Sequence, residues 1–151
     1  MNFDMKKASI ILMVLFFGCK AAQVNTEDAR VVYMKKTPCM GTCPNYDISI
    51  FSNGNVVLNA REHVGMEGTF NAKLTDDQFA SLMEAFESND FFSYRDSYKS
   101  NKTDLPTTTI SFKQDGEEKT IVDYDGAPQS LKDLEQKVDD LLELLDWRPA
   151  K

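Results

Sequence analysis

Alternating apolar and polar residues predict several β-strands in the first half of the chain. Tyr46, Ile48 and Ile50 fall on one side of a run whose other side carries Asp47, Ser49 and Phe51, which is the period of a half-buried strand. The dipeptide Asn53-Gly54 then gives a strong hairpin signal. We expect strands over residues 30–36, 46–51, 56–60 and, with the weakest pattern, 68–73.

A helical spacing of apolar residues follows directly. Thr75 is the expected N-cap, and Gln78 is its expected capping-box partner. One face of the segment is apolar at positions i, i+3, i+4 and i+7, which are Phe79, Leu82, Met83 and Phe86. This pattern predicts a helix that ends near Asn89.

The second half predicts a hairpin and another helix. β-Branched residues suggest strands over 107–112 and 119–124, joined by a turn at 114–117. Pro128 suits the first turn of the following helix, and Pro149 ends it. A stripe of apolar residues along this helix, interpreted as a core face, contains Leu131, Leu134, Val138, Leu141, Leu142 and Leu145.

Together these elements predict one α+β domain over residues 30–147. In it, an antiparallel β-sheet of about five to six strands packs against two α-helices on one face. The composition agrees, because 42% apolar residues, ten of them Phe, are enough for a single core in a chain of 151 residues. The polar segment 94–104 is expected to be a loop.

The first residues have the pattern of an export signal. Lys6-Lys7 precede an apolar run from Ala8 to Gly18, as in a secretory signal peptide. The run is too short to span a bilayer, which needs about 20 apolar residues. We therefore expect a signal peptide over residues 1–18.

The end of this run resembles a bacterial lipobox, although Phe16 stands where Leu is usual. The resemblance implies a lipoprotein in which Cys19 is acylated, with palmitate among its chains, and holds the protein to a membrane. Residues 19–29 would then be a flexible tether. The alternative is a plain cleaved signal with an unmodified Cys19.

These features predict a location in the bacterial cell envelope. A lipid anchor would leave the domain facing the periplasm or the cell exterior. The chain is also acidic, with 17 Lys and Arg against 24 Asp and Glu. This balance argues against nucleic acid as a partner, because nucleic-acid binding relies on basic side chains that neutralise phosphates.

Cys39 and Cys43 form a C-x3-C-P turn whose role has two interpretations. Export makes a disulfide between them the default expectation, and such a small loop adds about 2 kcal/mol of stability. The spacing also resembles that of Sco-type copper chaperones, where two thiolates and a distant histidine bind copper. His63 is the one histidine of this chain, so a copper-binding or thiol-redox protein is the alternative.

Three motifs together resemble an uncharacterised bacterial family, domain of unknown function 6438. They are Pro38–Tyr46 (PCMGTCPNY), Asp104–Thr108 (DLPTT) and Asp123–Pro128 (DYDGAP). The resemblance covers about residues 30–146. It implies a small exported domain, often lipidated, with no established activity.

All three motifs are expected at the ends of strands or helices, where loops present binding groups. If the sheet brings those ends together, Asp104, Asp123, Tyr124 and Asp125 would line one acidic, aromatic site that suits a hard cation such as calcium. The competing interpretation is that these residues only form turns and caps.

The sequence favours a binding domain over an enzyme. It contains no G-x-S-x-G, H-E-x-x-H or phosphate-binding glycine motif, and its single histidine limits acid–base chemistry. We expect no cofactor. The expected partners are the membrane, through the lipid anchor, and an envelope protein or another envelope component.

Overall fold

The computed structural model describes residues 28–151. The predicted signal peptide, the lipidation of Cys19 and all but the end of the predicted tether lie outside these residues. Within them, no helix is long and apolar enough to cross a membrane.

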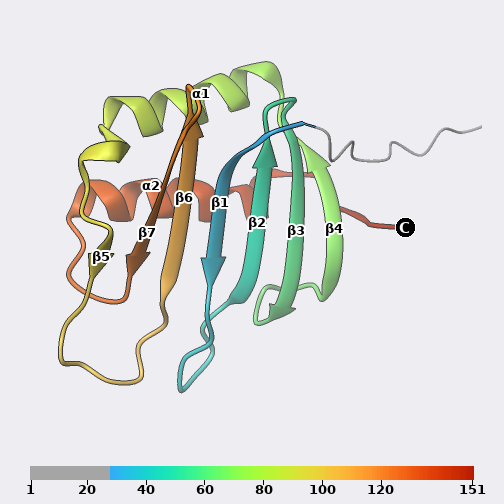
Figure 1. The fold of residues 1–151 in the computed structure, drawn as a ribbon. Helices are drawn as coiled ribbons and strands as arrows, with labels where there is room; N and C mark the ends of the chain where they lie inside the picture. Colours follow the sequence, from blue (N-terminus) through green and yellow to red (C-terminus); the bar gives the residue numbers. More distant parts are fainter. Residues whose placement is uncertain (1–27) are drawn as a thin grey trace, which may run out of the picture.

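The domain is built on one sheet with the strand order β5-β7-β6-β1-β2-β3-β4-β8 (Figure 1). Neighbouring strands are antiparallel, except that β5 runs parallel to β7. The strands are β1 (Arg30–Lys36), β2 (Asn45–Phe51), β3 (Asn55–Glu62), β4 (Gly68–Lys73), β5 (Ser97–Tyr98), β6 (Thr108–Gln114), β7 (Glu117–Asp123) and β8 (Arg148–Pro149).

Helices cover one face of this sheet. The two longer ones, α1 (Asp76–Ser88) and α2 (Gln129–Asp139), lie side by side on the same face (Figure 1). The short α3 (Leu141–Leu144) continues α2, and the 3-10 turn η1 (Phe91–Ser93) follows α1. The predicted α+β class, with helices on one face of a sheet, is therefore confirmed.

The predicted number of strands was too low. Each edge strand, β5 and β8, has only two residues, which is too few to show an alternating pattern. β5 lies inside the segment expected to be a loop, and its parallel pairing with β7 makes the sheet mixed. β8 contains Pro149 and pairs with β4, and an edge is where a strand tolerates proline.

The core fills the space between the sheet and the helices. Alternate residues of the central strands point into it, among them Met34, Ile48 and Leu58, which are all fully buried. From the helix layer, Phe86 stacks on Phe112 of β6 with 4.7 Å between the ring centroids. The leucine stripe of α2 and α3 is buried at Leu131, Leu134, Val138, Leu141 and Leu145, so its interpretation as a core face is confirmed.

Capping residues in the sequence correctly predicted where the two longer helices begin. The Thr75 hydroxyl accepts a hydrogen bond from the backbone N–H of Gln78 at 3.2 Å, and the Gln78 side chain accepts from the N–H of Thr75 at 2.8 Å. The capping box predicted for α1 is thus complete. At α2, Pro128 takes the N-cap position, directly before the first turn for which it was predicted.

Candidate functional site

The three motif segments meet at one end of the sheet, which we call the motif edge. Strand pairing brings them together, because Lys36 at the end of β1 lies opposite Tyr46 on one side and Thr108 on the other. Thr108 in turn lies opposite Asp123. The sheet therefore gathers these strand ends, and the disulfide loop projects from the same end in Figure 1.

A disulfide closes the loop between β1 and β2. Cys39 and Cys43 are bonded, with 5.6 Å between their Cα atoms, as the sequence predicted. Both cysteines are half-buried. Met40, between them, is 87% exposed, so the closed loop presents an apolar side chain to the solvent.

Hydrogen bonds tie the loop before β6 to the loop after β1. The N–H of Thr37 donates to the carbonyl of Thr107 at 3.1 Å, and the N–H of Thr107 donates to the Thr37 hydroxyl at 2.9 Å. Two loops distant in sequence are therefore held in one register.

The turn after β7 is bonded to the same region. The Tyr124 hydroxyl donates to the carbonyl of Lys102 at 2.8 Å and accepts from the N–H of Leu105 at 3.4 Å. Asp125 forms an ion pair with the Lys102 ammonium group at 2.9 Å. A hydrogen bond from Ser100, and then one from Lys102, lowers the pKa of Asp125, so its carboxylate is held charged.

The four residues expected to line one acidic site do not do so. Asp123 is 1% exposed and lies under α2, whereas Tyr124 and Asp125 contact the 100–105 loop. Successive strand residues point to opposite faces of a sheet, so Asp123 and Tyr124 diverge. Asp104 is exposed and adopts a positive φ of 65°, as a turn residue does.

The proposed metal ligands are not gathered either. Within residues 28–151, no group of three or more His, Cys, Asp or Glu side chains is placed to hold a metal ion. This applies to the trio Cys39, Cys43 and His63 and to the acidic residues of the motifs. His63 lies exposed in the turn between β3 and β4, with a φ of 58°.

Beneath the motif edge lies a group of charged and polar side chains that the sequence did not reveal. We call it the buried polar cluster, and it sits between α2 and the sheet. Its members are Lys36 of β1, Tyr46 of β2, Asp123 of β7, and Lys132, Glu135 and Asp139 of α2. One feature of the sequence could have indicated this cluster: Glu135 interrupts the buried face of α2 between Leu131 and Val138.

In one half of the cluster, Asp139 joins α2 to two strands. The Tyr46 hydroxyl donates to Asp139 Oδ1, and the Lys36 ammonium group donates to Asp139 Oδ2. Burial, reinforced by the charge of Asp139, raises the pKa of Tyr46. Tyr46 therefore remains a protonated donor.

In the other half, two buried carboxyl groups share one lysine. The Lys132 ammonium group pairs with Asp123 Oδ2 and lies 3.5 Å from Glu135 Oε2. Asp123 Oδ1 and Glu135 Oε1 are buried without a hydrogen-bond partner among the described residues. Burial raises the pKa of Glu135 to about 7; Lys132 opposes this shift and Asp123 adds to it. The pair can therefore hold a proton near neutral pH.

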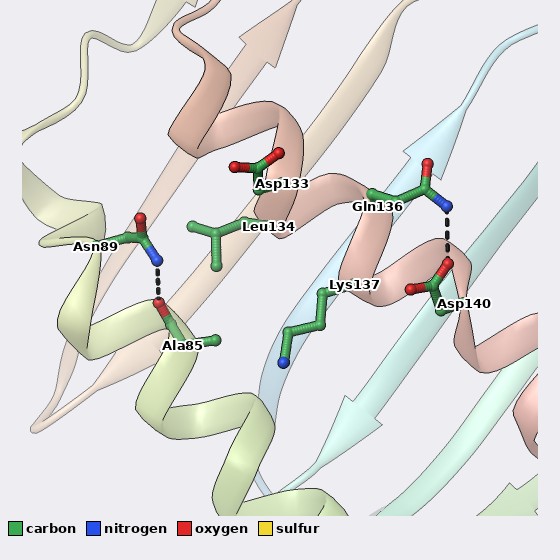
Figure 2. A pocket seen from close by; sticks show the side chains of 7 residues that line it. All are labelled: Ala85, Asn89, Asp133, Leu134, Gln136, Lys137 and Asp140. Carbon is green, nitrogen blue, oxygen red and sulfur yellow. Dashed lines mark hydrogen bonds between the residues drawn. The ribbon is translucent and has the colours of Figure 1, made fainter.

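A groove between α1 and α2 is less promising (Figure 2). It has a volume of about 400 Å³ and is lined by Ala85, Asn89, Asp133, Leu134, Gln136, Lys137 and Asp140. The Asn89 amide donates to the Ala85 carbonyl at 2.8 Å, and the Gln136 amide donates to Asp140 at 2.7 Å. These polar groups bond within their own helices, and we do not assign a site there.

We predict that Glu135→Gln removes a pH-dependent part of the folding stability. The folded pKa of Glu135, about 7, lies above its ordinary value of 4.5, so the native state keeps a proton that the unfolded chain releases. The stabilising contribution is full below about pH 4.5 and is lost as the pH rises through 7. It amounts to on the order of 3 kcal/mol.

Urea denaturation at a series of pH values between 4.5 and 8 measures this contribution. Glu143→Gln is the matched control, since Glu143 is exposed in the adjoining helix α3. The free energy of unfolding should fall with pH in the control and in the unchanged protein, and less steeply in Glu135→Gln. Equal slopes in both variants would contradict the prediction.

Comparison with known proteins agrees with the motifs. The family model described as "Domain of unknown function (DUF6438)" matches residues 30–142, which include both halves of the buried polar cluster and the whole motif edge. No curated protein matches the chain. Because the family model covers more than half of the sequence, the protein belongs to the DUF6438 family.

Proposed function

We propose that the protein is a lipid-anchored lipoprotein of the bacterial cell envelope whose domain binds another envelope component without catalysing a reaction. The export-like segment and the lipobox-like Cys19 support the anchor. The disulfide between Cys39 and Cys43 supports an oxidising compartment, because such bonds persist mainly in exported proteins.

The observation that carries the binding role is the construction of the motif edge. Its three loops are bonded to one another through Thr37, Thr107, Tyr124 and Lys102. A surface that is already rigid loses little conformational freedom on binding. Because the polar groups of these loops are used to hold the loops together, the edge suits recognition better than chemistry.

The motif edge also lies away from the anchor. The chain enters the domain beside the hairpin between β2 and β3, where the N–H of Ser52 donates to the carbonyl of Ala29. From there β1 runs the length of the sheet before it reaches the disulfide loop (Figure 1), a distance of about 23 Å at 3.3 Å per residue. A protein tethered through residues 19–29 would present its motif edge away from the membrane.

The anchor is tested by the mass of the mature protein. When the chain is expressed in a bacterium that processes lipoproteins, the product in the membrane fraction should begin at Cys19 and carry the added mass of its acyl chains. Cys19→Ser should abolish both the lipid mass and cleavage before residue 19. A mature protein cut elsewhere, with Cys19 unmodified, would overturn the anchor.

The binding surface is tested by photo-crosslinking in cells. Met40 on the motif edge and Leu144 on the helix layer are the two exposed large apolar residues of the described chain, at 87% and 60% exposure. A photoreactive amino acid at position 40 should give a discrete adduct, and one at position 144 should give none. Adducts of the same size at both positions, or none at position 40, would rule out the motif edge as the binding surface.

One observation supports a second candidate function, which is copper binding or thiol redox chemistry. Cys39 and Cys43 are half-buried rather than fully buried in the core, so reagents can reach them.

If the domain has only a binding role, the double variant Cys39→Ser, Cys43→Ser should lower the free energy of unfolding by about 2 kcal/mol. The reduced protein should then bind Cu(I) with a dissociation constant that is micromolar or higher. Tighter binding that is lost in His63→Ala would favour copper binding instead.

A further inference from the structure

The buried polar cluster holds one carboxyl group more than it has ammonium groups. Two lysines face three acidic side chains, which are Asp123, Glu135 and Asp139. Asp139 is paired with Lys36, so the other two carboxyl groups have only the ammonium group of Lys132 between them. That ammonium group balances one negative charge and leaves the second without a counter-charge.

The missing counter-charge coincides with missing hydrogen bonds. The side chains of Asp123 and Glu135 are 0% and 5% exposed. Asp123 Oδ1 and Glu135 Oε1 have no hydrogen-bond partner among the described residues, although the two carboxyl groups are close enough to bond to each other. A proton on one carboxyl group meets both needs, because it removes a negative charge and turns an acceptor into a donor.

Glu135 is the group that holds this proton. Burial raises its pKa to about 7, Lys132 opposes this rise and Asp123 adds to it. The cluster therefore changes its charge as the pH passes through neutrality. The charged and titratable groups around Glu135 are Lys132 and Asp139 of α2, Asp123 of β7, Lys36 of β1 and Tyr46 of β2.

The ion pair of Asp123 with Lys132 closes a segment of the motif edge. β7 ends at Asp123, and Lys132 lies in the first turn of α2, so the pair joins the two ends of the connecting segment 124–128. Within that segment, the Tyr124 hydroxyl bonds to the backbone of the 102–105 loop. The loop is therefore held by the segment, and the segment is held at its base by the buried pair.

We propose that a proton shared by Asp123 and Glu135 controls the rigidity of the motif edge. When the proton leaves, two negative charges lie beside one ammonium group in a buried site, which is unfavourable. Water then enters beside Lys132, whose side chain is 41% exposed, and the start of α2 moves away from the end of β7. The segment 124–128 moves with it, and Tyr124 releases the 102–105 loop.

This control makes recognition at the motif edge depend on pH. A rigid surface loses less conformational freedom on binding than a loose one, so binding is strongest below neutral pH and weakens above it. Only this consequence rests on the proposed function. The change in the motif edge is a property of the free protein, and it is measured without a partner.

NMR titration of the full chain in a nonionic detergent, between about pH 5 and pH 8.5, tests the proposal. The carboxyl carbons of Asp123 and Glu135 should titrate together near pH 7. The amide protons of Leu105 and Tyr124 should shift upfield with the same midpoint, because they lose their hydrogen bonds to the Tyr124 hydroxyl and the Tyr98 carbonyl. The amide proton of Gly54, bonded to Phe51 in the hairpin between β2 and β3, should not shift.

Glu135→Gln should keep the motif edge rigid at every pH in this range, because its amide carries no charge and donates a hydrogen bond without a shared proton. The Leu105 and Tyr124 signals should then stay at their low-pH positions. Glu143→Gln, on the exposed side of α3, should keep the titration of the unchanged protein. His63→Gln is a second control, because histidine side chains change charge in the same pH range.

Three results would overturn the proposal. If the Leu105 and Tyr124 signals titrate equally in Glu135→Gln, or cease to titrate in His63→Gln, Glu135 does not control them. If Glu135 titrates near pH 7 while both signals stay fixed, the proton is bound but does not act on the motif edge. If Gly54 shifts with the same midpoint, the whole domain loosens. None of these results would alter the mass of the mature protein or the crosslinking at position 40.

Discussion

Charge buried beneath α2 is the constraint on which the rest of the domain depends. A charged side chain removed from water must be paired, and an unpaired one costs several kcal/mol. Asp139 meets this requirement with Tyr46 and Lys36, and Asp123 meets it with Lys132. These pairs connect α2 to β1, β2 and β7 and so help to define its position on the sheet.

This constraint gives the family motifs a structural meaning. Tyr46 ends the first motif and Asp123 begins the third, and both side chains point under α2 rather than into the solvent. The neighbouring residues Cys43 and Tyr124 shape the loops above. Each of these two motifs thus contributes one residue that positions the helix and others that rigidify the motif edge.

The loops of the motif edge form one surface at the end of the sheet. The motif edge is a rigid set of loops with one exposed apolar tip, Met40. All helices of the described residues lie on one side of the sheet (Figure 1).

Sequence alone determined what depends on neighbouring residues: the period of the long strands, the capping box of Thr75 and Gln78, and the cysteine spacing. Tertiary structure decided the rest. The two-residue strands β5 and β8 exist only through their partners. Tyr46 and Asp139 are 93 positions apart, so no local pattern joins them. Asp123 is buried only because α2 packs over the end of β7, so only the fold could place Asp123 in the core and Tyr124 among the loops.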